Sequence, residues 1–96
     1  MIYELRFHAL ALKEWKKLDR ELQLQFQKIL KRRLEDPHVM SAKLSGRLKD
    51  CYKIKLRQSG YRLVYHVHDA KLIVLIVVIG KRDKNKVYDF AMSRVE

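Results

Sequence analysis

Polar and hydrophobic residues alternate at the start of the chain. In Ile2–Phe7 the side chains of Tyr3, Leu5 and Phe7 fall on one side of an extended backbone, and charged residues fall on the other. Alternation with a period of two is typical of a strand that buries one face. We therefore predict a half-buried first strand here.

The period then changes to that of a helix, twice in succession. Leu12, Trp15 and Leu18 recur at helical spacing, with charged residues between them. Asp19 is the expected N-cap of a second helix, and Asp36-Pro37 ends it because the residue before a proline avoids the helical region. The apolar stripe of this second helix consists of Leu22, Phe26, Ile29, Leu30 and Leu34. The pattern predicts two antiparallel helices that cover a sheet.

Three further strands follow an irregular connection. Tyr52–Leu56 and Tyr61–His68 alternate, whereas Leu72–Ile79 is almost entirely aliphatic and ends at Gly80. A strand that is apolar on both faces belongs in the middle of a sheet. We therefore place Leu72–Ile79 between Tyr61–His68 and the first strand. A short final helix is indicated by Val87, Phe90 and Ala91.

Alternation also fixes the register of the first hairpin, because residues that face each other across two strands point to the same side of the sheet. The predicted pairs are Leu56 with Tyr61, Lys55 with Arg62 and Ile54 with Leu63. Lys53, Lys55 and Arg62 then share one solvent-facing patch.

The second hairpin is expected to bring more cations to this patch. With Asp69-Ala70 as a short turn, the predicted pairs are His68 with Lys71 and Arg62 with Val77. Lys81 and Arg82 then emerge beside Arg62, and Tyr88 folds over the same spot. Like charges on adjacent strands repel, so a protein that gathers them is expected to bind a phosphate there. The alternative is that these are ordinary solvated charges on an exposed face.

Length and charge narrow the class of partner. The 96 residues form one expected domain, residues 1–96, and 48% of them are hydrophobic, which is enough for a core. The chain has 22 Lys and Arg against 11 Asp and Glu, a formal net charge of +11. This excess predicts a nucleic acid or an acidic protein as partner. An anionic membrane surface is the competing interpretation, but no basic amphipathic helix stands apart from the core pattern.

The cysteine content and the apolar runs bear on the compartment. The single cysteine, Cys51, excludes an internal disulfide and fits a reducing environment. The run Leu72–Ile79 is too short to span a bilayer as a helix, and the first residues lack the features of a signal peptide. We therefore expect a cytoplasmic protein with no membrane partner.

The residues of the basic patch lie in segments that resemble one known family. These segments are Asp50–Arg57 (DCYKIKLR) and Ser59–Tyr65 (SGYRLVY), together with Leu12–Trp15, Lys43-Leu44, Val78–Arg82 and Val87-Tyr88. In combination they resemble the RelE toxins of type II toxin–antitoxin systems, and the likeness covers nearly the whole chain. One departure is the pair His66 and His68, where we expect neutral polar or apolar residues.

The resemblance implies an α+β fold, with a four-stranded antiparallel sheet packed against an N-terminal helical hairpin and a short C-terminal helix. It implies an endoribonuclease that cuts mRNA in the ribosomal A site and inhibits translation. It also implies a cognate acidic RelB-like antitoxin, in a heterotetramer that represses its own operon and meets operator DNA only through the antitoxin. By matching position, the catalytic set is Lys53, Lys55, Arg62, Arg82 and Tyr88. Arg47, Arg57 and Lys81 are the corresponding candidates for contacts with message or ribosomal RNA.

RNA can be cut without a metal ion if its own 2′-hydroxyl attacks the adjacent phosphorus. Arg62 suits the charge that develops on the phosphate, because its planar fork matches two phosphate oxygens. Arg82 shares this clamp or protonates the leaving oxygen, Lys53 adds positive field, and Tyr88 and Lys55 are rival candidates for the base. Ordinary pKa values of Tyr and Lys lie near ~10, far above neutrality. We therefore expect weak cleavage of free RNA, with the ribosome supplying substrate positioning.

Other chemistries find less support in the sequence. No cysteine or carboxylate stands at metal-ligand spacing from the four histidines, so we expect no metal and no cofactor; the pair His66 and His68 is the minor candidate. Cys51 is expected to be a buried structural thiol. Two alternative functions stay open, namely a non-catalytic toxin resembling ParE, which acts on gyrase, and a basic nucleic-acid-binding module that acts by charge alone.

Overall fold

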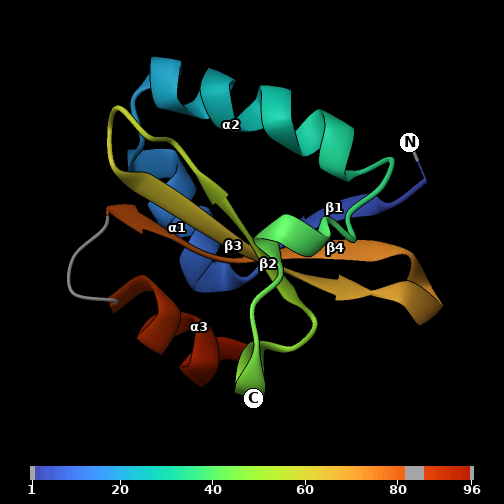
Figure 1. Ribbon diagram of the computed structural model, residues 1–96. Coiled ribbons are helices and arrows are strands. Elements are labelled where there is room, and N and C mark those ends of the chain that lie inside the picture. The colour runs from blue at the N-terminus through green and yellow to red at the C-terminus, as the bar shows by residue number, and fades with distance from the viewer. Residues whose placement is uncertain (1, 82–85, 96) are drawn as a thin grey trace.

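The computed structural model describes residues 2–81 and 86–95, which form a sheet with helices on both sides (Figure 1). The elements are β1 (Glu4–Phe7), α1 (Ala9–Lys17), α2 (Arg20–Arg33), β2 (Cys51–Lys55), β3 (Tyr61–His68), β4 (Ile73–Lys81) and α3 (Lys86–Val95). Two 3-10 helices, Met40–Ala42 and Gly46–Leu48, lie between α2 and β2, and a third, Asp69–Lys71, lies between β3 and β4. Within the described residues, no helix is long and apolar enough to cross a membrane.

Both N-terminal helices begin at a side-chain cap. Nδ1 of His8 accepts a hydrogen bond of 3.1 Å from the backbone N–H of Leu10 at the start of α1. Asp19 Oδ1 accepts one of 2.9 Å from the N–H of Leu22, which confirms the predicted N-cap of α2. Three members of the predicted apolar stripe of α2 are fully buried, namely Phe26, Leu30 and Leu34.

The sheet is mixed, with strand order β1-β4-β3-β2, so the aliphatic strand lies in the interior of the sheet as predicted. β4 and β3, and β3 and β2, are antiparallel, but β1 pairs with β4 in parallel from Glu4 opposite Ile73 to Phe7 opposite Ile76. The expectation of an antiparallel sheet is therefore wrong for this pair. Alternation reports which face a side chain occupies and says nothing of strand direction. A parallel pair also needs a long crossover, which α1, α2 and two strands provide here.

The predicted register of the β2–β3 hairpin is confirmed. Lys55 lies opposite Arg62 and Ile54 opposite Leu63. The N–H of Leu56 donates to the carbonyl of Tyr61 at 2.9 Å, which closes the ladder next to the loop.

The predicted register of the β3–β4 hairpin is wrong. His68 lies opposite Ile73, Arg62 lies opposite Gly80, and β4 continues through Gly80 to Lys81. The turn is longer than two residues, because it contains the 3-10 helix Asp69–Lys71 and Leu72 in the left-handed region at φ 53°. A β-bulge then adds a further shift, since Tyr65 faces Ile76 whereas Val64 faces Val78, which leaves Val77 as the extra residue.

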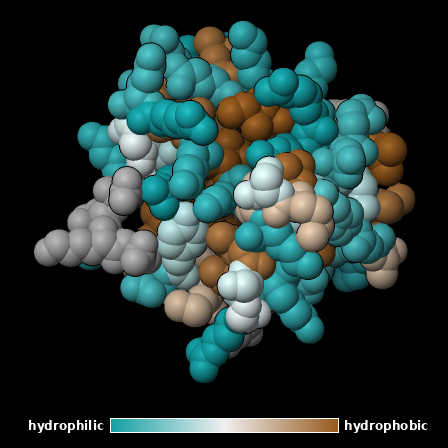
Figure 2. Space-filling model, viewed as in Figure 1, coloured by the Kyte–Doolittle hydropathy of each residue, from teal (hydrophilic) through white to brown (hydrophobic). Residues whose placement is uncertain are grey.

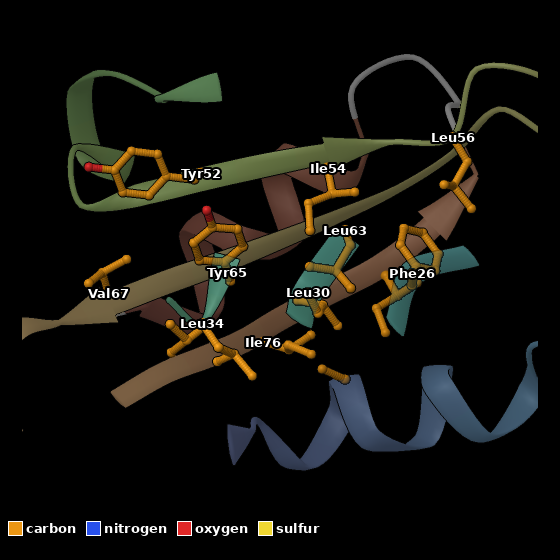
Figure 3. Close-up of a cluster of buried hydrophobic side chains, with 13 residues drawn as sticks. Phe26, Leu30, Leu34, Tyr52, Ile54, Leu56, Leu63, Tyr65, Val67 and Ile76 are labelled. Carbon is orange, nitrogen blue, oxygen red and sulfur yellow. The ribbon is translucent and has the colours of Figure 1, made fainter. Parts of the chain in front are cut away.

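Two apolar layers hold the helices to the two faces of the sheet. Between the sheet and α1–α2 the core includes Phe26, Leu30, Leu34, Tyr52, Ile54, Leu63, Tyr65 and Ile76, whose side chains point toward one another (Figure 3). Between the sheet and α3 the core consists of Leu48, Cys51, Val64, Val77, Val78, Val87 and Ala91. Hydrophilic residues cover most of the surface seen in Figure 2, with hydrophobic residues visible between them near the centre.

Candidate functional site

Three of the predicted site residues lie on the α3 side of the sheet. In β2 the residues Tyr52 and Ile54 are buried toward α1 and α2, so Lys53 and Lys55 point to the opposite side. Lys55 lies directly opposite Arg62 of β3. The two hairpin strands therefore bring Lys53, Lys55 and Arg62 together, as their alternation predicts.

Tyr88 joins these cations from α3. Nη1 of Arg62 donates a hydrogen bond of 2.8 Å to the Tyr88 hydroxyl oxygen, and Cζ of Arg62 lies 5.8 Å from the centroid of the Tyr88 ring. Val87, which precedes Tyr88, is buried against the sheet, and an added Cβ at Gly80 would lie 3.4 Å from its Cγ2 atom. Gly80 lies opposite Arg62, so α3 meets the sheet next to the arginine.

A cleft of about 370 Å³ opens beside this cluster. Its lining residues are Lys55, Leu56, Arg57, Gly60, Tyr61 and Arg62. Of these six described residues, three are cations and none is a carboxylate. Guanidinium and ammonium groups that converge on one cleft favour a phosphate as the bound group. The placement of Arg57 at this cleft agrees with its prediction as an RNA contact, which stays a prediction.

The backbone of Lys81 follows Gly80 next to Arg62, but its side chain lies on the opposite face of the sheet, contrary to the sequence prediction. Lys81 is paired with Tyr61, whose ring packs against the α1–α2 layer, and the Nζ atom of Lys81 lies 5.7 Å from the centroid of that ring. Lys81 lines a separate cleft with Asp19 and Ser59. The bulge at Val77 causes the difference, because one extra residue moves each following side chain of β4 to the other face.

Neither Lys53 nor Arg47 is among the residues that line the cleft. Arg47 is exposed and lies in the 3-10 helix Gly46–Leu48, which packs against α3. Arg82 lies outside the described residues.

The thiol of Cys51 lies on the same side of β2 as Lys53 but is fully buried. Burial, and to a smaller extent the nearby Asp50 carboxylate, raise the pKa of this thiol to about 12. A neutral, inaccessible thiol is a packing group rather than a nucleophile, so the prediction of a buried structural cysteine is confirmed.

An ion pair that the sequence analysis missed holds α3 in position. Arg94 of α3 makes two hydrogen bonds of 2.9 Å to the Glu14 carboxylate of α1. Glu14 also accepts the N–H of Ile79 at 3.0 Å, and Arg94 donates to the carbonyl of Val77 at 2.9 Å. The pair thus occupies the edge of β4 beyond the last residue of β1. No sequence signal links Glu14 to Arg94, since 80 positions separate them.

A second polar cluster was also missed. Tyr3 and His38 both bond to Asp69 Oδ1 at 2.7 Å, and Nδ1 of His38 lies 2.8 Å from the Tyr52 hydroxyl. The hydrogen bond from Tyr3, followed by that from His38, lowers the pKa of the Asp69 carboxyl. This cluster joins the start of the chain to β2 and to the β3–β4 turn, away from the basic cleft. In residues 2–81 and 86–95, no three His, Cys, Asp or Glu side chains gather closely enough to hold a metal ion.

The chain matches a known protein family and is similar to known proteins. The family model described as the ParE toxin of the type II toxin–antitoxin system parDE matches residues 5–86. The chain is also similar to the mRNA interferase toxin RelE of Escherichia coli, with 48% identity over 95 residues that cover 99% of each chain.

Solved structures give the same result. The free state of a doubly substituted RelE toxin from E. coli superposes with a TM-score of 0.90 at 47% identity, over 100% of both chains. The same substituted toxin in complex with a peptide of the antitoxin RelB matches with a TM-score of 0.82 at 48% identity, over 95% of both chains.

Proposed function

This chain belongs to the RelE toxin family, and from that membership and its basic cleft we propose that it is an mRNA interferase that cuts message in the ribosomal A site without a metal ion. The observation that carries the proposal is the contact between Arg62 and Tyr88 beside Lys55 and Arg57. Cations from β2, β3 and the loop between them, with a tyrosine from α3, converge where one phosphate fits.

The reaction is attack of the RNA 2′-hydroxyl on the adjacent phosphorus. The 2′-oxygen forms a bond to phosphorus as the bond to the 5′-oxygen breaks, which leaves a 2′,3′-cyclic phosphate, or its opened 3′-phosphate, and a 5′-hydroxyl. Three tasks fall to the protein, namely removal of the 2′ proton, stabilisation of the charged phosphorane and protonation of the leaving oxygen.

Arg62 is the proposed phosphate clamp, with Lys53 adding positive field. An arginine has only donors, so its contact with Tyr88 uses a lone pair of the phenolic oxygen and leaves the tyrosine O–H to face a third group. Tyr88 is therefore placed to exchange a proton with a phosphate ester held by Arg62. Tyr88 and Lys55 remain the two candidates for the base, and Arg82, outside the described residues, is assigned to the clamp or the leaving group.

Dependence on the ribosome follows from what this cleft contains. Among the described residues that line it there is no histidine or carboxylate, so these residues supply no conventional acid–base pair. Fixing the 2′-oxygen, phosphorus and 5′-oxygen in line can compensate, because positioning alone can be worth several kcal/mol. We assign this positioning to the ribosome. Arg47 and Lys81, which are exposed and do not line the cleft, are the proposed contacts with ribosomal RNA.

The proposed protein partner is an acidic RelB-like antitoxin, in a heterotetramer that meets operator DNA only through the antitoxin. The formal net charge of +11 supports an acidic partner. The RelB peptide complex of the E. coli relative supports its class. We place both proteins in the cytoplasm, where translating ribosomes are found.

The test maps 5′ ends of cut message on purified ribosomes. Wild type is compared with Arg62→Ala, Arg82→Ala, Tyr88→Phe and Lys55→Ala, and Lys28→Ala is the matched control because it removes an exposed lysine from α2, on the other side of the sheet. We expect A-site cuts by wild type and Lys28→Ala, and strongly reduced cutting by the four site variants. Uncut message with wild type, or equal cutting by Arg62→Ala, would reject the proposal.

The alternative is a ParE-like toxin, because the matching family model carries that name. The 48% identity to a RelE over 99% of both chains is the more specific finding and favours the ribonuclease. The two are separated by gyrase assays beside the ribosome assay. Inhibition of DNA supercoiling with intact message would favour the alternative. A steeply salt-dependent complex with RNA, without any product, would favour a module that binds by charge alone.

A further inference from the structure

His66 and His68 of β3 form a second candidate site, independent of the cleavage cleft. They are two residues apart on a strand, so both side chains point to the same face of the sheet. His66 is half-buried and His68 is exposed. Nδ1 of His66 lies 3.0 Å from Nε2 of His68, and the ring centroids are 4.3 Å apart.

This spacing of two imidazole nitrogens suits a shared metal ion. Metal–nitrogen bonds to histidine are about 2.0–2.1 Å long, so two nitrogens 3.0 Å apart subtend roughly 91–97° at the metal. Neighbouring positions of a square-planar or octahedral ion are separated by a right angle, whereas a tetrahedral ion needs a wider one. Cu(II) and Ni(II) prefer tetragonal nitrogen and oxygen ligands, and imidazole suits both.

We propose that His66 and His68 chelate a divalent transition metal, Cu(II) or Ni(II), through Nδ1 and Nε2 at adjacent coordination positions. With these bond lengths, the metal ion lies about 1.4 Å from the line that joins the two nitrogens. Each imidazole ring therefore has to rotate so that its nitrogen lone pair points at the ion and no longer at the other nitrogen. His68 is exposed and lines an open groove, so its ring has room for this adjustment. The hydrogen that bridges the pair without metal moves to another ring nitrogen.

The residue that faces His66 adds no ligand. Cys51 of β2 lies opposite His66, but its thiol is fully buried and is not a third ligand.

Two cations limit the affinity. Arg6 and Lys71 line the groove that contains His68, although Arg6 is paired with Glu4 at 2.9 Å. Since the described residues bring no third His, Cys, Asp or Glu to the pair, water completes the coordination shell. The site is therefore open and exchangeable, unlike a closed structural metal centre.

The metal would not take part in the proposed cleavage. Arg62 precedes His66 by four residues on β3, which corresponds to about 13 Å along the strand. Message cleavage in the presence of a chelator is accordingly expected to be the same in wild type and in His66→Gln or His68→Gln.

Calorimetric titration of Ni(II) and Cu(II) into protein without a polyhistidine tag tests the site. We expect one ion per chain, and affinity lower by roughly tenfold or more in His66→Gln and in His68→Gln, because the second imidazole no longer binds intramolecularly. His8→Asn is the control, since asparagine preserves the cap of α1 while removing one histidine. Equal binding by wild type and both glutamine variants, or none by wild type, would overturn the proposal.

Geometry and protonation are tested separately. The electron paramagnetic resonance spectrum of the Cu(II) form should show two coordinated nitrogens, reduced to one in each glutamine variant. Affinity should fall by roughly tenfold or more between pH 7.5 and 5.5, because protons compete for imidazole. Zn(II) binding tighter than Ni(II) binding would contradict the right-angle geometry, and pH-independent affinity would contradict histidine ligation.

Discussion

The guanidinium of Arg62 on β3 donates a 2.8 Å hydrogen bond to the hydroxyl of Tyr88 on α3. This contact links the strand that carries the proposed phosphate clamp to the helix that covers the sheet. Its 26-residue separation means that the site exists only once α3 has packed onto β3 and β4. Folding of the C-terminal helix and assembly of the site are thus one event.

The Arg62–Tyr88 pair should behave as a unit in catalysis. We expect Arg62→Lys and Tyr88→Phe each to slow ribosome-dependent cleavage by roughly 10²–10³-fold, the range for loss of one charge-stabilising donor. The double variant should lose much less than the product of the two effects, since each change already disrupts the same contact. Single-turnover rates on ribosomes measure this. Multiplicative losses would mean that the two side chains act separately.

Removing one partner of the Glu14–Arg94 pair should destabilise the fold. The Arg94 side chain is 9% exposed and that of Glu14 27% exposed, so either partner left alone is a poorly solvated charge. We expect Arg94→Met to lower the free energy of unfolding by about 2–4 kcal/mol. Urea denaturation measures the change.

The control for that ion pair is Arg6→Ala. The Arg6–Glu4 pair has a similar length of 2.9 Å, but its side chains are about 60% exposed. Its loss should change the free energy of unfolding by less than about 0.5 kcal/mol. Equal effects of the two substitutions would show that burial of the Glu14–Arg94 pair has no energetic weight.

The buried thiol of Cys51 should make the free energy of unfolding fall at alkaline pH. Its pKa is raised to about 12 in the folded protein, so the thiol ionises first in the unfolded chain. The stabilising contribution is complete below the unfolded pKa, near 9, and is lost as the pH rises toward 12. The free energy of unfolding of wild type should therefore drop more between pH 8 and pH 10.5 than that of Cys51→Ala. Parallel pH profiles of the two proteins would contradict this reasoning.

Replacing Leu72 with glycine should stabilise the folded protein. Leu72 has a φ of 53° in the β3–β4 turn, and its side chain is 47% exposed. A side chain costs about 1–2 kcal/mol in this left-handed region, whereas glycine adopts it freely. Leu72→Gly is expected to raise the free energy of unfolding by about 0.5–1 kcal/mol, and Leu72→Ala should give no gain. Thermal and urea denaturation of both variants check this, and equal shifts would exclude backbone strain as the cause.

Alternation along the sequence was sufficient to place Lys53, Lys55 and Arg62 together, because a tight hairpin with one buried face allows only one register. It failed for β4. The left-handed conformation of Leu72 and the bulge at Val77 each depend on contacts made elsewhere in the fold. An all-aliphatic strand also has no polar positions from which the face of each side chain could be predicted. Lys81 was misplaced for that reason. The parallel direction of β1 and the Glu14–Arg94 pair arise from tertiary packing, which no local pattern records.

At the edge of β4 beyond β1, Glu14 and Arg94 occupy an N–H and a C=O that would otherwise be open to a strand from another molecule. A hydrophobic strand with a bare edge is a template for aggregation, and β4 is the most aliphatic segment of the chain. The Glu14–Arg94 pair therefore protects the protein from aggregation as well as stabilising its fold. A chain that loses it should precipitate at concentrations where the wild type remains monodisperse.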